Sequence, residues 1–247
     1  MGPEDLTLTK LDELLSKLGD SADNDPWTPR LNPPARIRQY RRLAYAVGPR
    51  YAKATLNNYQ VYDRSNADRD SQEQCVEYIR GFCEVMPDCL HNGGGLIFFG
   101  RPGTGKDHLM VACMYWATLR HGFSVLWRDG PMLAQEIRDR IGGDESERQL
   151  VDRYVEPQIL AISDPIPPKG DTSAWVTDTL QRIIDRRYRA CKSTWATINV
   201  RDGAEAEQRL APPLVDRLRH GSLCLQCEWE SYRGREKGDP THVADRD

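Results

Sequence analysis

The chain has 247 residues and a formal net charge of −3 at pH 7, so it can form one large domain, or one domain with an appendage. Its charge is too nearly balanced to identify a partner. Its seven cysteines lack the spacing of a disulfide scaffold, and the sequence has neither a membrane-spanning apolar run nor the apolar stretch of a signal peptide. We therefore expect a cytoplasmic protein with no membrane partner.

Residues 1–25 form an acidic segment with seven acids and two lysines. Four leucines recur there at helical spacing, which predicts an amphipathic helix over residues 7–19, followed by a linker. A helix this short is marginal in isolation. It therefore packs either on its own domain or on a partner protein.

Residues 26–55 form a basic arm. Residues 30–53 hold seven basic residues and no acid, and a helix is predicted over residues 35–46, behind Pro33 and Pro34. This concentration of charge has two interpretations, an interaction surface for nucleic acid or an acidic protein, or a solvated linker.

From about Tyr59 the sequence alternates between strand and helix patterns, and we assign residues 56–235 to one α/β domain and residues 236–247 to a polar tail. The predicted strands are 96–99, 123–129, 158–164, 193–200 and 222–229. The predicted helices are 71–86, 107–120, 131–141, 145–155 and 173–192. Alternation of this kind predicts a mostly parallel sheet with helices on both faces and a ligand site at the carboxyl ends of its strands.

The stretch "LIFFGRPGTGKDHL" at residues 96–109 fits the phosphate-loop pattern G-x-x-x-x-G-K between a strand and a helix. Its backbone N–H groups and the helix N-terminus can surround phosphate oxygens, and Lys106 can reach the β- and γ-phosphates. The alternative is a glycine-rich turn before a core helix. The predicted nucleotide contacts are Gly100, Pro102, Gly103, Thr104, Gly105, Lys106, Asp107 and His108.

Asp107 occupies the position at which such loops carry the Ser or Thr whose hydroxyl binds Mg²⁺. Its carboxylate is also a hard oxygen ligand. The alternative role is an acid in the first helical turn that favours the helix dipole.

The strand over residues 159–162 ends in Ser163–Asp164, where nucleotide-hydrolysing enzymes usually carry Asp-Glu. In one register Ser163 takes the metal position and Asp164 activates water; in the other, Asp164 holds the metal and no base follows. Our hypothesis is that the metal-binding acid has moved from Ser163 to Asp107, so that ATP binds while hydrolysis is slow or absent. Asn199, at the tip of the next strand, either holds the attacking water or caps a turn.

Four stretches together resemble the DnaC/IstB branch of the AAA+ ATPases, and within it the DnaC-type replicative helicase loaders. They are "GRPGTGKDHL", "LQRIIDRR", "TINV" and "LVDRLRHGSLCLQCEWESYR". The resemblance covers roughly residues 50–235. It implies a P-loop NTPase fold of the AAA+ type, a three-layer α/β arrangement preceded by a small helical N-terminal region, with ATP and Mg²⁺ as cofactors. Ser163–Asp164 departs from the family's pattern, which concerns hydrolysis and not the fold.

The resemblance also implies roles for single residues. Lys106 is similar to the Walker A lysine, Asn199 to the sensor 1 residue and Arg233 to the sensor 2 arginine. Arg217 resembles an arginine finger, which acts on a neighbouring subunit's nucleotide and so implies a homo-oligomer.

Residues 131–157 are similar in position to an insertion that lines a channel for single-stranded DNA. Their expected phosphate contacts are Arg138, Arg140, Arg148 and Arg153. Residues 1–50 are expected to bind a replicative helicase.

Three functions are compatible with these features. The first is an ATP-dependent loader that delivers a replicative helicase to single-stranded DNA, with ATP acting mainly as an assembly switch. The second is an IstB-type transposition helper ATPase, which co-purification with a transposase would indicate. The third is a nucleic-acid-binding adaptor without nucleotide chemistry, which a failure to bind ATP or ADP would indicate.

Overall fold

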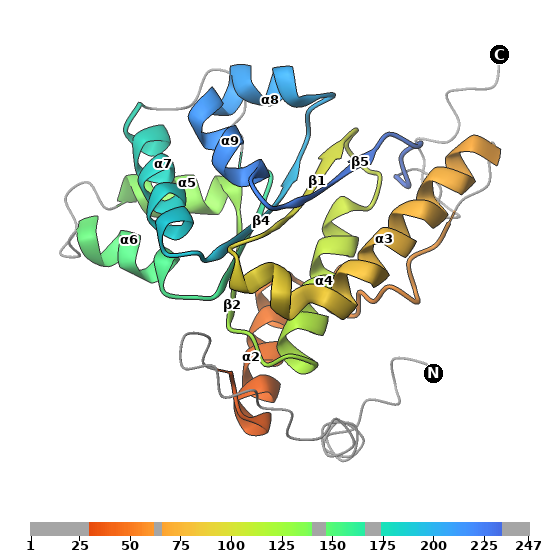
Figure 1. The fold of residues 1–247 in the computed structure, drawn as a ribbon, viewed down its shortest axis with the longest axis horizontal. Helices are drawn as coiled ribbons and strands as arrows, with labels where there is room; N and C mark the ends of the chain where they lie inside the picture. Colours follow the sequence, from red (N-terminus) through yellow and green to blue (C-terminus); the bar gives the residue numbers. More distant parts are fainter. Residues whose placement is uncertain (1–29, 62–65, 140–146, 166–173, 234–247) are drawn as a thin grey trace.

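The computed structural model describes residues 30–61, 66–139, 147–165 and 174–233, and its centre is a parallel five-stranded sheet (Figure 1). The strands are β1 (Leu96–Gly100), β2 (Val125–Asp129), β3 (Ile159–Ser163), β4 (Ser193–Ile198) and β5 (Leu223–Cys227). Their order across the sheet is β2-β3-β4-β1-β5. This order places β3, β4 and β1 side by side in the middle.

Helices cover both faces of the sheet, and each face has its own buried core. On one face lie α2 (Pro33–Ala46), α3 (Asn66–His91) and α4 (Lys106–Leu119). On the other lie α5 (Gly130–Asp139), α6 (Glu147–Val155), α7 (Ala174–Arg189), α8 (Gly203–Leu210) and α9 (Pro212–Arg219). In the part of the chain that the structure describes, no helix combines the length and apolarity needed to cross a membrane.

The pleat of the strands divides their side chains between the two cores. On β1, Leu96 and Phe98 join one core and Ile97 joins the other. On β3, Ile159 and Leu160 divide in the same way. Strands buried on both faces read as continuous apolar runs, which is why these segments were recognisable in the sequence.

The strand register brings distant polar residues to one edge of the sheet. Phe99, just before the phosphate loop, pairs with Ile198 of β4, and Thr197 of β4 pairs with Ser163 of β3. The carboxyl ends of the three central strands therefore meet beside the loop between β1 and α4.

The α/β class and the mostly parallel sheet with helices on both faces are confirmed. Each predicted strand is present, and so is each predicted helix from residue 33 onward. The helix expected over residues 7–19 lies outside the described residues. The sequence reading placed no helix at α8, although Asp202 and Glu205 form a capping signal: Asp202 Oδ1 accepts a hydrogen bond from the Glu205 N–H at 2.9 Å.

The helix α3 is longer than the predicted 71–86 and continues through Pro87 to His91. Pro87 has no N–H to donate to the carbonyl of Cys83 four residues earlier. His121 Nε2 lies 3.2 Å from that carbonyl and supplies the missing donor. A donor from the end of another helix thus stabilises the proline within α3.

Candidate nucleotide-binding site

The phosphate loop between β1 and α4 has a conformation that depends on glycine. Gly105 precedes α4 with φ 84°, in the left-handed region. A Cβ atom built there would lie 2.8 Å from the Tyr59 ring. The loop therefore needs glycine both for its backbone angle and for its packing.

Residues from both ends of the domain hold this loop in place. The carbonyl of Thr104 accepts hydrogen bonds from Tyr59 Oη at 3.1 Å and from Trp229 Nε1 at 2.8 Å. The N–H of Tyr232 donates to the carbonyl of Gly103 at 2.8 Å. The carbonyls of Gly103 and Thr104 are thus hydrogen-bonded within the protein, so the loop has its shape before a ligand binds.

Lys106 is buried, and its ammonium group turns back onto the loop. Its Nζ donates to the carbonyls of Gly100, at 3.0 Å, and Arg101. Burial lowers the pKa of Lys106. An arriving phosphate would give this buried ammonium a charged partner, which is stronger than a carbonyl partner.

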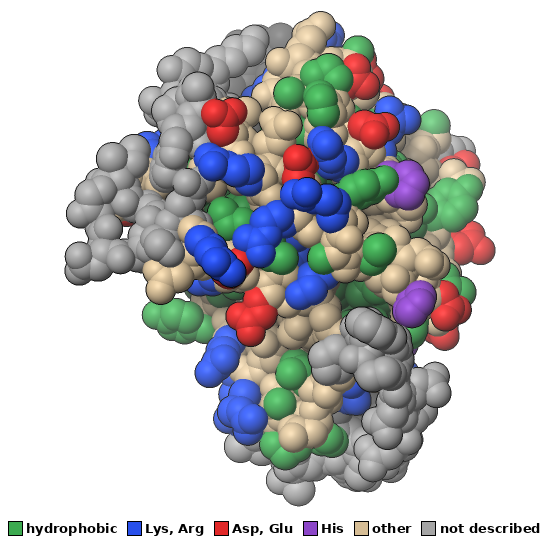
Figure 2. Space-filling model, turned by 60° about the vertical axis from the view of Figure 1, so that its left-hand side comes forward, with side chains coloured by type: hydrophobic (Ala, Val, Ile, Leu, Met, Phe, Trp, Pro, Cys, Tyr) green, Lys and Arg blue, Asp and Glu red, His purple; other side chains and the backbone are tan. Residues whose placement is uncertain are grey.

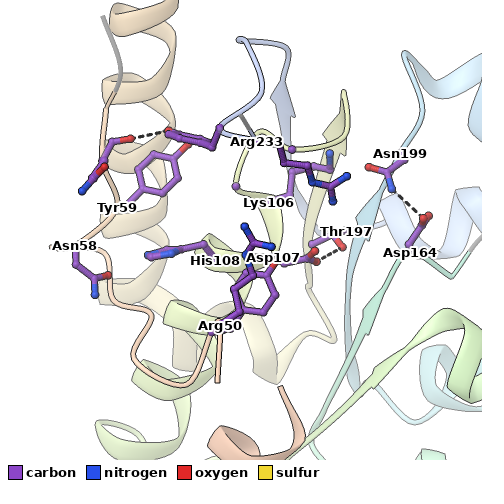
Figure 3. A pocket seen from close by; sticks show the side chains of 15 residues that line it. Arg50, Asn58, Tyr59, Lys106, Asp107, His108, Asp164, Thr197, Asn199 and Arg233 are labelled. Carbon is purple, nitrogen blue, oxygen red and sulfur yellow. Dashed lines mark hydrogen bonds between the residues drawn. The ribbon is translucent and has the colours of Figure 1, made fainter. Parts of the chain in front are cut away.

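A cavity of about 300 Å³ opens above the loop (Figure 3). Residues 50–60 form one wall, and the loop, the tips of β3 and β4 and the segment after β5 form the rest. Its lining residues are Arg50, Tyr51, Asn58, Tyr59, Gln60, Gly103, Gly105, Lys106, Asp107, His108, Asp164, Thr197, Asn199, Tyr232 and Arg233. The two arginines give it positive charge at opposite sides (Figure 3).

Asp107 lies at the junction of the loop, β3 and β4. Its Oδ1 accepts hydrogen bonds from Ser163 Oγ and from Thr197 Oγ1, both at 2.7 Å. Ser163 therefore contacts the carboxylate that replaces the usual loop hydroxyl, and Thr197 adds a second donor that the sequence reading missed. One carboxylate and two hydroxyls thus lie where nucleotide-hydrolysing sites usually have one hydroxyl and one carboxylate.

Asp164 lines the same cavity next to Asn199. Its Oδ2 accepts a hydrogen bond from Asn199 Nδ2 at 2.8 Å (Figure 3). Its Oδ1 is buried and has no hydrogen-bond partner among the described residues. A buried carboxylate oxygen without a donor is costly, and a metal-bound or attacking water would satisfy it.

This donor set fits Mg²⁺. The ion is usually held by one or two carboxylates together with phosphate oxygens and waters, and Asp107 and Asp164 both line the cavity beside the phosphate loop. The unpartnered oxygen of Asp164 is the observation that favours a hydrated cation here. Asp107 is the better candidate for direct contact because it lies in the first turn of α4, directly after Lys106.

A family model described as IstB-like ATP binding protein matches residues 37–239. The chain belongs to this IstB-like family. It is 28% identical to the replicative helicase loader DnaC of Escherichia coli K12 over 194 residues, which cover 78% of this chain and 74% of that protein. It is 32% identical to DnaC of Buchnera aphidicola subsp. Baizongia pistaciae over 196 residues, 76% of this chain and 73% of that protein. A crystal structure of the DnaC helicase loader has the same fold, with a TM-score of 0.63, 23% identity, and coverage of 73% of this chain and 100% of that one.

Within this IstB-like chain, the predicted nucleotide contacts divide into two groups. The cavity is lined by Gly103, Gly105, Lys106, Asp107 and His108. Gly100, Pro102 and Thr104 do not line it. The carbonyls of Gly100 and Thr104 instead accept hydrogen bonds that hold the loop in shape.

His108 connects the loop helix to the wall formed by residues 50–60. Its Nε2 lies 2.9 Å from the carbonyl of Thr55, and its ring packs edge-on against Tyr59 at 5.6 Å. Burial lowers the pKa of His108, so the ring is neutral near pH 7. The role of residues 50–60 at the cavity was not predicted, because these residues follow no motif or periodicity.

The two arginines with predicted roles at the nucleotide lie in different places. Arg233 lines the cavity, directly after Tyr232. Arg217, on α9, is not among the lining residues; its Nε lies 3.0 Å from Oδ1 of Asp185 on α7. Its predicted role toward a neighbouring subunit's nucleotide stays a prediction.

Of the arginines predicted to contact DNA, the three that the structure describes have different surroundings. Arg138 is exposed at the end of α5, and Arg140 lies outside the described residues. Arg153 lies over the Tyr154 ring at 5.7 Å. Arg148, exposed on α6, lies near the arginines of α7.

Proposed function

We propose that this chain is an ATP-binding loader that delivers a replicative helicase to single-stranded DNA. Two relatives that align with three quarters of its length are named replicative helicase loaders. The observation that carries the proposal is the preformed cavity in which the phosphate loop, Asp107, Asp164 and Arg233 converge. ATP acts chiefly as a switch for assembly, because a γ-phosphate can order an interface without being cleaved.

The loop residues bind the triphosphate. Backbone N–H groups at the start of α4 and the ammonium group of Lys106 contact phosphate oxygens. Arg50 and Arg233 add positive charge from opposite sides of the cavity. Mg²⁺, when bound, supplies the charge that neutralises the phosphates.

Asp107 holds the metal side of the site, with Ser163 and Thr197 fixing the orientation of its carboxylate. Asp164 and Asn199 orient water at the strand tips. Hydrolysis would be slow because the acid that would hold Mg²⁺ lies at Asp107 instead of at Ser163 of β3, and small displacements of reacting groups can cost about 100-fold in rate.

Assembly into a homo-oligomer completes the site. Arg217 would then leave Asp185 and reach the nucleotide of the adjoining copy. Residues 1–50 would contact the helicase, and arginines beyond β2 would contact DNA.

Two measurements test the proposal. Calorimetry with ATP and Mg²⁺ should show micromolar binding that Lys106→Ala abolishes, since the phosphates lose the ammonium group that contacts them. A pull-down from cells of the source organism should recover a replicative helicase. Recovery of a transposase instead would identify a transposition helper, and no nucleotide binding at millimolar ATP would identify an adaptor.

A further inference from the structure

Helix α3 carries an apolar stripe on its exposed side. Tyr78 is 52% exposed and Val85 is 50% exposed, and Gly81 lies between them on the same side of the helix. We call these three residues the α3 stripe. Figure 1 shows α3 at the periphery of the domain, while on the face that Figure 2 shows, hydrophobic side chains are scattered among many Lys and Arg side chains.

The glycine of the stripe has no packing role inside the domain. A Cβ atom built at Gly81 would meet no heavy atom within 4 Å beyond the backbone of α3 itself. Glycine in an exposed helix interior is less stable than alanine, so the position is not optimised for the helix alone. A glycine between two larger side chains leaves a hole into which a side chain of a second helix can pack.

Acidic residues border the stripe along one edge. Glu77 and Glu84 are exposed and seven residues apart, and they directly precede Tyr78 and Val85. In a pair of packed helices, this is a position at which charged side chains select the partner and its orientation. A helix that covers the stripe should therefore carry cations at the matching positions.

The N-terminal segment of the same chain has the matching pattern. The helix expected over residues 7–19 has leucines as its apolar face. Lys10 and Lys17 are seven residues apart, and they directly precede Leu11 and Leu18. The cations thus occupy the same place beside this apolar face that the acids occupy beside the α3 stripe.

The equal placement of the two charge pairs selects one orientation. When two helices pack antiparallel, the positions that precede their apolar residues lie opposite one another, so Lys10 would meet Glu84 and Lys17 would meet Glu77. A parallel pair would instead place the lysines beside the other edge of α3, where Phe82 is buried. Antiparallel packing is therefore favoured.

The chain enters the described part of the domain beside α3. Nη1 of Arg30, the first described residue, donates to the carbonyl of His121 at 3.0 Å, and His121 Nε2 lies 3.2 Å from the carbonyl of Cys83 on α3. Residues 20–29 can extend over roughly 33 Å, whereas the stripe spans only about 10 Å along the helix. The linker is long enough for the leucine face to reach α3, and such a short tether favours docking within one chain over docking between chains.

We propose that residues 7–19 form a helix that docks antiparallel on the α3 stripe of their own chain. Apolar contact holds this helix, because exposed ion pairs contribute little to stability, and the lysine–glutamate pairs set its direction. The inference goes beyond the proposed function and does not depend on it. The leucine face cannot contact a partner protein while it covers α3, so α3 competes with any partner of this segment.

A zero-length carbodiimide tests the docking in the full chain, because it joins a lysine to a carboxylate in direct contact. Mass spectrometry should find Lys10 linked to Glu84 and Lys17 linked to Glu77. Links of Lys10 to Glu77 and of Lys17 to Glu84 would contradict the antiparallel arrangement and overturn the inference. In a mixture of isotope-labelled and unlabelled chains, links between the two kinds of chain would show docking between copies and would also overturn it.

Hydrogen exchange of the amides of residues 7–19 measures the docking independently. K10E/K17E and E77K/E84K should each lower their protection by about fivefold or more, because two attractive contacts become repulsive. The variant that combines all four changes restores opposite charges and should recover most of the protection. Protection that is absent in the unaltered chain, or a combined variant no better protected than the two double variants, would overturn the inference.

A substitution in the stripe itself tests the apolar contact. Val85→Asp should lower the protection of the segment by about tenfold or more, because the contact with the leucines is lost. Arg80→Asp, exposed on another side of α3, is the matched control and should change it little. Equal effects of the two changes would overturn the inference. ATP binding by calorimetry should be the same in both variants, because neither residue lines the nucleotide cavity, which separates a failure of the docking from a failure of the proposed function.

Discussion

At the scale of single residues, the exchange of chemical groups between Asp107 and Ser163 distinguishes this nucleotide site. The carboxylate lies in the first turn of α4, beside the loop, and the hydroxyl lies on β3; Ser163 Oγ is 2.7 Å from Asp107 Oδ1. An anion on the loop repels a triphosphate until a cation screens it. ATP binding should therefore depend on Mg²⁺ more strongly than in a site with a loop hydroxyl.

This dependence can be tested by moving the acid. Asp107→Ser should improve ATP binding in EDTA, because the carboxylate no longer repels the phosphates. It should also reduce, by about tenfold or more, the factor by which Mg²⁺ tightens ATP binding, because the contact of the carboxylate with the metal is lost. The double variant D107S/S163D returns an acid to the site and should restore most of that gain. Titrations with a fluorescent ATP analogue, with and without Mg²⁺, measure both. An unchanged gain in Asp107→Ser would show that the metal does not use this carboxylate.

At the scale of the element, the exposed and the buried side of α7 have different roles. Its outer side carries Arg182, Arg186 and Arg189, while Arg187 is fully buried. The Arg187 guanidinium donates to Thr194 Oγ1 and to the carbonyls of Tyr154, Pro157 and Gln158, at 2.8 to 3.0 Å. Burial lowers its pKa to about 9, so it stays charged at neutral pH. One side chain thus joins the end of α6 to the starts of β3 and β4.

Replacing Arg187 by Met should destabilise the domain by roughly 3–5 kcal/mol, because several buried carbonyls lose their donor at once. Urea unfolding followed by circular dichroism measures the change. Arg189→Met on the exposed side of the same helix is the matched control and should stay within about 0.5 kcal/mol. Equal effects of the two changes would show that the buried hydrogen bonds contribute little.

At the scale of the whole molecule, stability should fall in mild acid. Burial lowers the pKa of both His108 and His121. A folded-state pKa below the unfolded value of about 6.5 means that the unfolded chain binds the proton more readily. Stability is therefore complete above that value and is lost as the pH falls through the unfolded pKa toward the lower folded one.

Thermal melts between about pH 7.5 and 5.5 check this expectation. His121→Gln keeps an N–H donor near the Cys83 carbonyl but cannot titrate, so its melting temperature should fall less with acid. His91→Gln, at the exposed C-terminal end of α3, is the control. A melting temperature as acid-sensitive in His121→Gln as in the unaltered chain would exclude His121 as a cause.

The sequence was informative wherever short-range pattern decides structure. Apolar runs of strand length and a helical period predicted the sheet and most helices, and the glycine spacing predicted the loop around Lys106. Thr197 and Tyr59 were not predictable in this way, because their place at the site depends on strand register and on packing between distant segments.

The two hydrogen bonds on the Thr104 carbonyl come from Tyr59 and Trp229, which are far apart along the chain. During synthesis, Tyr59 emerges from the ribosome long before Trp229. We expect a nascent chain that ends before Trp229 to carry the whole glycine motif and yet bind ATP weakly, and stalled chains of increasing length, photo-crosslinked to labelled ATP, would reveal the step. Competence for nucleotide should thus arrive late in synthesis, which would keep half-made copies out of any assembly that ATP promotes.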